Sequence, residues 1–235
     1  MSARVRAALA VKRVIDLLGA AIALVLLAPV LAWTAVAIAV TDGFPVLFRH
    51  PRLGLHAREF VVVKFRTMRA PRSDERWYDS DRDRVSRLGR WLRATSSDEL
   101  PQLWNVLRGD MSLVGPRPLL VEYRTRYTAR ERRRHDMRPG ITGWAAVNGR
   151  NTARFEDRLR LDVWYVDHWS LALDIRIVAM TVLQVLRRTD ARSVQEFDEI
   201  EFPDRFMEGL EAGSHRPDAV DSSGSTGGAE EASAR

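Results

Sequence analysis

The stretch Leu17–Val40, LLGAAIALVLLAPVLAWTAVAIAV, decides how this chain is organised. It contains no charged residue, and it exceeds the about 20 apolar residues that a helix needs to cross the hydrocarbon core of a bilayer. The run is too long for the apolar core of a signal peptide, and no small-residue cleavage site with a polar continuation follows it. We therefore predict a membrane helix that stays in the protein.

Two features bear on whether this helix crosses the bilayer. Pro29 lies in the middle of the run, where it removes a backbone donor and favours a bend. Basic residues flank both ends: Arg4, Arg6, Lys12 and Arg13 before the run, and Arg49, Arg52, Arg58 and Lys64 after it. Because flanking Lys and Arg favour the cytoplasm, both ends are expected on that side. A helix-break-helix that enters one leaflet and returns satisfies both observations; a single-pass anchor with a tolerated proline is the alternative.

Composition excludes several kinds of site. The chain has 235 residues, enough for one compact catalytic unit, and its formal net charge of +6 suits an anionic partner such as phosphate, nucleic acid or acidic lipid. It has no cysteine, which excludes disulfides, thiolate nucleophiles and cysteine-based metal centres. The histidines show no ligand spacing, and no Walker, Rossmann or GxSxG motif is present.

Local patterns after the membrane segment predict a mainly helical α+β fold with short strands and interfacial amphipathic helices. Alternation predicts a strand over Glu59–Met68, with Lys64 and Arg66 on one face. Ser96 and Glu99 stand in capping-box spacing before an apolar stripe that ends at Gly109. Further helices are expected near Val85–Leu92, Thr125–Arg138, Phe155–Trp169 and Asp174–Arg188, with a turn-rich connection over Asp110–Pro118.

The chain is thus divided into three parts. Residues 1–46 form the re-entrant membrane segment, and residues 47–207 form a membrane-associated catalytic domain. Residues 208–235 are rich in Gly, Ser, Ala and acidic residues without periodicity, so we expect them to be disordered.

The adjacent carboxylates Asp98 and Glu99 are the sharpest candidates for chemistry. They lie in the first turn of a predicted helix, after Arg90 and Arg93, and a helix N-terminus stabilises carboxylates and attracts phosphate. A carboxylate there could attack phosphorus or hold a divalent cation. The alternative is that both residues only cap the helix, with Glu99 closing the capping box.

Basic residues supply candidate phosphate ligands. Arg117 lies between Pro116 and Pro118, which restrain its backbone and suit it to bidentate phosphate binding, although a solvated arginine in a proline-rich turn explains the pattern equally well. Lys64 and Arg66 could bind phosphate or protect an edge strand. Trp144 could contact a ligand or serve as a core anchor.

Five segments together resemble the bacterial sugar transferase family, the monotopic phosphoglycosyl transferases, over about Lys12–Arg188. They are KRVIDLLGAAIALVLLAPVLA, VVVKFRTMR, LRATSSDELPQLWNVLRGDMSLVGPRPLL, RPGITGWAAVNGRN and DVWYVDHWSLALDIRIVAMT. The resemblance implies a re-entrant helix broken near Pro29 and a catalytic part at the cytoplasmic face of the bacterial inner membrane. The chain looks like the minimal catalytic type of this family.

The resemblance also implies a two-step reaction. Asp98 would attack the β-phosphate of a UDP-sugar, expel UMP and form a phosphosugar-aspartyl intermediate. A polyprenyl phosphate, usually undecaprenyl phosphate, would then accept the phosphosugar, which begins the assembly of a bacterial glycan. Glu99 completes the acidic pair, and Mg²⁺ bound by Asp98 is the expected cofactor. Basic positions expected near the phosphates are Lys64, Arg66, Arg93, Arg117 and Arg150.

The chain departs from the family pattern at Ala28, where a serine often precedes the proline, and at Ala146, where a glutamine is usual. Neither position belongs to the carboxylate pair. No residue identifies the sugar, and large aromatic residues on the membrane side would permit a homodimer.

Two other functions are alternatives to this one. A non-catalytic basic scaffold that binds a membrane surface would use the carboxylates only as helix caps. A nucleic-acid-binding protein would explain the arginines but not the apolar run, so we expect no nucleic-acid partner.

Overall fold

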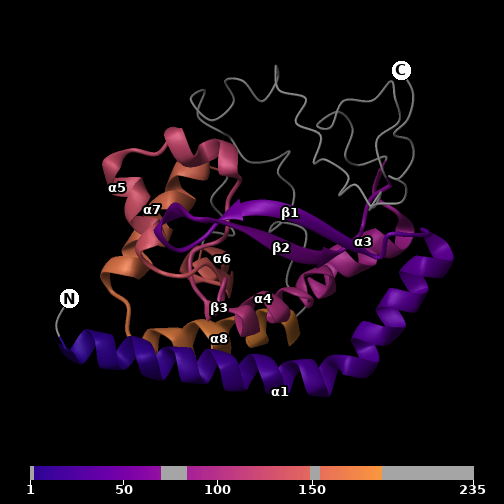
Figure 1. Cartoon of the computed structure of the whole chain (residues 1–235), viewed down its shortest axis with the longest axis horizontal. Coiled ribbons are helices and arrows are strands. Elements are labelled where there is room, and N and C mark those ends of the chain that lie inside the picture. Colours follow the sequence, from indigo (N-terminus) through magenta and orange to yellow (C-terminus); the bar gives the residue numbers. More distant parts are fainter. Residues whose placement is uncertain (1–2, 70–83, 149–153, 187–235) are drawn as a thin grey trace, which may run out of the picture.

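The computed structural model describes residues 3–69, 84–148 and 154–186. It has the predicted mainly helical α+β architecture (Figure 1). The α-helices are α1 (Ala3–Thr41), α3 (Arg87–Ala94), α4 (Gln102–Arg108), α5 (Ala129–Arg132), α6 (Trp144–Asn148), α7 (Phe155–Asp167) and α8 (Leu171–Leu186). The 3₁₀ turns are η1 (Leu55–Ala57), η2 (Ser97–Glu99), η3 (Val121–Thr125) and η4 (Arg133–Asp136). The strands are β1 (Leu47–Leu53), β2 (Glu59–Phe65), β3 (Ser112–Val114) and β4 (Gly140–Thr142). Arg150 and the tail predicted at 208–235 lie outside the described residues.

The N-terminal helix α1 runs along one side of the molecule and then turns up around its end (Figure 1). It is 39 residues long with Pro29 inside it, and it is long and apolar enough to cross a membrane. Its surface divides into a face that contacts the domain and an exposed apolar face. The exposed face includes Leu18, Val25, Leu26, Trp33 and Val40. Large exposed apolar surfaces of this kind mark contact with lipid or with another protein.

The domain packs against α1 on both sides of Pro29. Before the proline, Ala20 and Leu24 contact a hydrophobic cluster built from β2 and α4. After it, Leu31 and Ile38 pack on a second cluster, to which β2 and α3 contribute. The helix therefore lies along the domain instead of projecting from it.

Polar contacts fix the first part of α1. Lys12 is buried and donates hydrogen bonds to Asp174 Oδ2 of α8 at 2.7 Å and to the Val114 carbonyl at 3.0 Å. Asp16 accepts hydrogen bonds from Ser112 Oγ and the Leu113 N–H of β3. Lys12 is thus neutralised inside the protein, so it does not act as the solvent-exposed flanking charge that its sequence position suggested.

The hairpin β1–β2 is antiparallel, with Leu47 opposite Phe65 and Leu53 opposite Glu59. The predicted strand is confirmed as β2, but it ends at Phe65, three residues before the predicted Met68. Its partner β1 was not predicted, because Pro51 lies inside it and proline is depleted in strands.

The second half of the domain differs more from the sequence prediction. Phe155–Asp167 and Leu171–Leu186 confirm the last two predicted helices. The helix predicted over Thr125–Arg138 is wrong, because this segment forms the short α5 and the 3₁₀ turn η4 instead. The turn-rich connection contains a strand, β3, that pairs with β4 in parallel.

Glycines allow the two strands of this parallel pair to continue into closely packed loops. A Cβ on Gly140 would lie 2.1 Å from the Gly115 nitrogen, and a Cβ on Gly143 would lie 2.1 Å from the Gly115 carbonyl oxygen. Only glycine permits backbone segments to approach so closely. This contact fixes the chain at Gly115, directly before Pro116.

Substituting Gly143 tests this contact. Gly143→Ala should lower the free energy of unfolding by more than about 2 kcal/mol, since the methyl group collides with backbone that cannot rotate away. Gly43→Ala is the control: among the described residues its Cβ meets no atom within 4 Å, although φ is 75°. It should cost only about 1 kcal/mol for the left-handed backbone. Thermal unfolding in detergent measures both, and equal losses would contradict the close approach.

Candidate active site

The carboxylate pair lies in η2, the 3₁₀ turn between α3 and α4. Asp98 is 4% exposed and Glu99 is 7% exposed. The predicted capping box is wrong, because α4 begins only at Gln102, after Pro101. Ser96 is left-handed at φ 54°, and its side chain makes no capping hydrogen bond in the described structure. Helix capping therefore does not explain Glu99.

Glu99 is held by two cations from different parts of the chain. Lys64 Nζ of β2 donates to Glu99 Oε1 at 2.6 Å, and Arg117 Nη2 donates to the same oxygen at 3.0 Å. Burial by itself would raise the pKa of Glu99, but Lys64 and Arg117 outweigh it and lower the pKa to about 2. Glu99 is therefore ionised at neutral pH and joins β2 to the loop that follows β3.

Asp98 has the opposite environment. Burial and then the neighbouring charge of Glu99 raise its pKa to about 6, against the opposing effect of nearby cations. Its Oδ1 is buried and has no hydrogen-bond partner among the described residues. At pH 7 Asp98 is thus largely ionised with an oxygen free to react. Two adjacent carboxylates whose pKa values are pushed apart are typical of residues with separate chemical roles.

The position of Arg117 is fixed through its backbone. Arg134 Nη2 donates to the Arg117 carbonyl at 2.6 Å. Arg134 and Asp162 are themselves a fully buried ion pair at 2.6 Å. The sequence drew attention to the prolines around Arg117 but not to this pair, whose members come from η4 and α7. Together they hold the Arg117 side chain towards Glu99.

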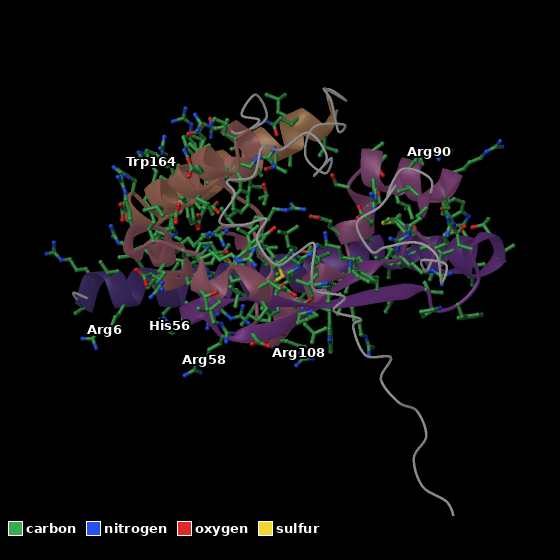
Figure 2. The ribbon with its side chains drawn as sticks, turned by 90° about the horizontal axis from the view of Figure 1, so that it is seen from above. Arg6, His56, Arg58, Arg90, Arg108 and Trp164 are labelled. Carbon is green, nitrogen blue, oxygen red and sulfur yellow. The ribbon has the colours of Figure 1, made fainter. Side chains whose placement is uncertain are left out.

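The remaining predicted basic residues divide into two groups. Arg93 Nε donates to Thr67 Oγ1 at 3.0 Å, and its charge acts on Asp98, so the structure brings it to the carboxylate pair. Arg66 is not brought there: β2 ends before it, and its guanidinium donates to backbone carbonyls at residues 42–44, where α1 ends. Lys64 and Arg66 therefore point to different places, contrary to the sequence prediction. Arg90 lies at the outer edge of the molecule and donates to the Val85 carbonyl (Figure 2).

Two arginines near the site were missed by sequence reasoning. Arg52 of β1 and Arg158 of α7 both have pKa values lowered first by burial and then by the charge of Arg117, to about 10 for Arg52. Each is one of many arginines in the chain and belongs to no motif, so no sequence signal distinguishes them. The charge of Arg117 therefore acts on both Arg52 and Arg158.

Trp144 is an anchor between helices. Its ring stacks on Trp164 of α7 at a centroid distance of 4.7 Å, and the Arg176 guanidinium lies 5.9 Å from its ring. Trp164 lies far from Arg90 along the molecule (Figure 2). The structure therefore favours the packing interpretation of Trp144 over ligand contact.

A magnesium ion could be held only with help from a ligand. Among the described residues no three acidic or histidine side chains cluster as a metal site. Mg²⁺ commonly uses one or two carboxylates together with substrate phosphates, keeping several waters. The carboxylate of Asp98 fits such a shared site, whereas the Oε1 of Glu99 is already occupied by two cations.

These features define a class of protein. A buried carboxylate with a free oxygen is surrounded by cations, and the domain that carries it packs along an apolar helix. Such a site suits a phosphorylated ligand near a membrane. The family model described as bacterial sugar transferase matches residues 7–188, and this chain belongs to that family.

Individual relatives agree with this assignment. The "Uncharacterized sugar transferase EpsL" of Bacillus subtilis (strain 168) is 47% identical over 175 residues, which cover 74% of this chain and 87% of the relative. The "UDP-glucose:undecaprenyl-phosphate glucose-1-phosphate transferase" of Caulobacter vibrioides is 43% identical, covering 77% of this chain and 71% of the relative. The "Undecaprenyl-phosphate glucose phosphotransferase" of Komagataeibacter xylinus is 45% identical, and the match spans 73% of this chain but only 35% of that protein.

The raised pKa of Asp98 predicts a gain in stability when its charge is removed. The pKa of about 6 for Asp98 in the folded protein exceeds the ordinary aspartate value of 3.8, so the wild-type protein loses stability as the pH rises from about 4 through 6. Asp98→Asn should therefore raise the free energy of unfolding at pH 8 by about 3 kcal/mol, with the difference vanishing below pH ~4. Glu99→Gln should lower stability at pH 8, because it leaves Lys64 and Arg117 without their carboxylate. Unfolding curves at both pH values measure this, and a destabilised Asp98→Asn at pH 8 would contradict it.

Proposed function

We propose that this chain is a phosphoglycosyl transferase that moves a phosphosugar from a UDP-sugar to undecaprenyl phosphate and releases UMP. The observation that carries the proposal is the division between the two carboxylates. Glu99 is locked by Lys64 and Arg117, while Asp98 presents a buried oxygen without a partner among the described residues. The substrates named for the Caulobacter relative support the same reaction.

In the first step, Asp98 Oδ1 attacks the β-phosphorus of the donor. A bond forms between this oxygen and phosphorus, and the bond from phosphorus to the bridging oxygen breaks, so that UMP leaves with the electron pair. Arg93, Arg117 and Lys64 lie where they can neutralise negative charge on the phosphate oxygens. Because Asp98 has a pKa of about 6, it is largely ionised and nucleophilic at neutral pH.

In the second step, a phosphate oxygen of undecaprenyl phosphate attacks the same phosphorus. The bond between phosphorus and Asp98 breaks, the carboxylate is restored, and undecaprenyl-diphosphate-sugar is formed. Glu99 stays ionised throughout and holds Lys64 and Arg117 in place. Asp98, together with the donor phosphates, would hold Mg²⁺, which supplies further neutralisation of phosphate charge.

The product is a lipid-linked sugar of the kind that begins exopolysaccharide, O-antigen, capsule or glycoprotein glycan assembly. None of the described residues of the site identifies the sugar. Relatives are named for UDP-glucose and, at 38% identity, for UDP-galactose, so these are the donors to compare first.

We also propose that α1 is re-entrant and that the domain lies at the cytoplasmic face of the inner membrane. The support is that the domain packs against α1 both before and after Pro29, through residues such as Ala20 and Ile38. If α1 crossed the bilayer, its two halves would lie at different depths. A domain on one side of the membrane could then not pack against both halves. The bend of α1 seen in Figure 1 and the exposed apolar face of this helix fit a segment that enters one leaflet and returns.

Removing the proposed nucleophile tests the reaction. Asp98→Ala and Asp98→Asn should lower UMP release from the preferred UDP-sugar at least about 10³-fold, because the proposed covalent intermediate forms on the Asp98 carboxylate. Asp157→Asn on the surface of α7 is the matched control and should keep wild-type activity. A radiolabelled sugar, quenched before acceptor is added, should map to Asp98. Label on another residue, or kinetics that require both substrates at once, would overturn the covalent mechanism.

Cysteine labelling tests the topology, since the chain has no cysteine of its own. Arg6 precedes the apolar run and Arg58 follows it, and both side chains point away from the molecule (Figure 2). Cysteines in Arg6→Cys and Arg58→Cys should both react with a membrane-impermeant reagent only from the cytoplasmic side. Trp33→Cys, on the exposed apolar face, should stay unlabelled in intact membranes. Labelling of Arg6→Cys and Arg58→Cys from opposite sides would support a single-pass anchor.

A further inference from the structure

Arg158 lines a cavity that Arg117 also lines. The cavity has a volume of about 60 Å³. Arg117 is also the residue that reaches Glu99, so the cavity adjoins the candidate active site. Arg158 comes from the first half of α7, far in sequence from every residue of the carboxylate pair.

The positive charge of this cavity is only partly balanced. Arg117 shares Glu99 Oε1 with Lys64, so one carboxylate serves two cations. Asp162, whose charge acts on Arg158, already pairs with Arg134 at 2.6 Å. Within residues 3–69, 84–148 and 154–186, Arg158 Nε is buried without a hydrogen-bond partner and Arg158 forms no ion pair. An anion is the ligand that satisfies both arginines.

The cavity walls limit the size of that anion. Much of the lining consists of small residues, which leave room in the cavity for one small group. They are Gly115, Gly140, Gly143, Ala145 and Ala146. Its volume is far below the roughly 300–1,000 Å³ of pockets that enclose drug-sized ligands. It therefore has room for a single charged group and not for an entire nucleotide sugar. A phosphate group next to two guanidinium groups matches this size and charge.

We propose that Arg158 and Arg117 together bind a phosphate group in this cavity, which Arg117 connects to Glu99. The proposal rests on the proposed function, which supplies two sources of phosphate: the one that leaves as UMP and the one at the head of the polyprenyl acceptor. Arg117 then contacts both Glu99 and the phosphate, while Arg158 contacts only the phosphate. A phosphate held here neutralises the repulsion between Arg158 and Arg117.

The test compares Arg158→Gln with Arg160→Gln in the purified full chain. Arg160 is on the same helix, is exposed and pairs with Asp157 at 3.1 Å, so it controls for loss of an arginine from α7. Three quantities are measured: the Kd for UMP by calorimetry, the KM for polyprenyl phosphate, and the melting temperature. Arg158→Lys is the second variant, because it keeps the charge but lacks the planar fork that binds phosphate in two places.

Loss of a charge-assisted phosphate contact should raise the affected constant about tenfold or more in Arg158→Gln, with no change in Arg160→Gln. A raised Kd for UMP assigns the cavity to the donor phosphate, and a raised KM for polyprenyl phosphate assigns it to the acceptor. Arg158→Lys should fall between Arg158→Gln and the wild type. If Arg158→Gln and Arg158→Lys alter only the melting temperature, or alter nothing, the proposal is overturned.

Failure of the phosphate-site proposal can be distinguished from failure of the proposed function. If the wild-type chain releases UMP from a UDP-sugar but the Arg158 variants keep both constants, only this inference fails. If no UDP-sugar is consumed while UMP binding still depends on Arg158, the phosphate site stands and the transferase proposal fails.

Discussion

The carboxylate of Glu99 is the interaction on which the site depends. Lys64 and Arg117 are both cations and would repel each other, but each donates to the same Glu99 oxygen. Removing a single partner from such a buried cluster leaves uncompensated charge, so its three members depend strongly on one another. The same cluster acts on Asp98: burial raises the pKa of Asp98 first and the charge of Glu99 raises it further, while Asp98 Oδ1 has no hydrogen-bond partner among the described residues.

The apolar helix is also part of the domain core. Ala20 and Ile38 of α1 are fully buried against elements that carry the site, including β2 and α3. β2 supplies Lys64, and α3 supplies Arg93. A shift of α1 in the membrane would therefore be transmitted to the elements that hold two of the cations. Membrane attachment and the arrangement of the site are thus coupled through hydrophobic packing.

Periodicity and local chemistry predicted α1, β2, α7 and α8, because each has a clear apolar pattern of its own. They failed where the structure depends on distant partners. β1 contains Pro51, and the parallel pair β3–β4 is too short to show a pattern. Ser96 and Glu99 have capping-box spacing, yet Lys64 and Arg117 compete successfully for the Glu99 side chain. For the site, the resemblance to a family identified Asp98 and Arg117, but Arg52, Arg158 and the Arg134–Asp162 pair required the fold.

The buried pair of Lys12 and Asp174 has a consequence for the order in which the chain assembles. The two residues are 162 positions apart, so Lys12 leaves the ribosome long before its final partner exists. An unpaired ammonium group at the start of an apolar helix is costly to bury. Asp16, one turn along and 3.9 Å from Lys12, provides a carboxylate from the same helix during that interval. When α8 is synthesised, Asp174 completes the pairing of Lys12, so the last of the described helices secures the first.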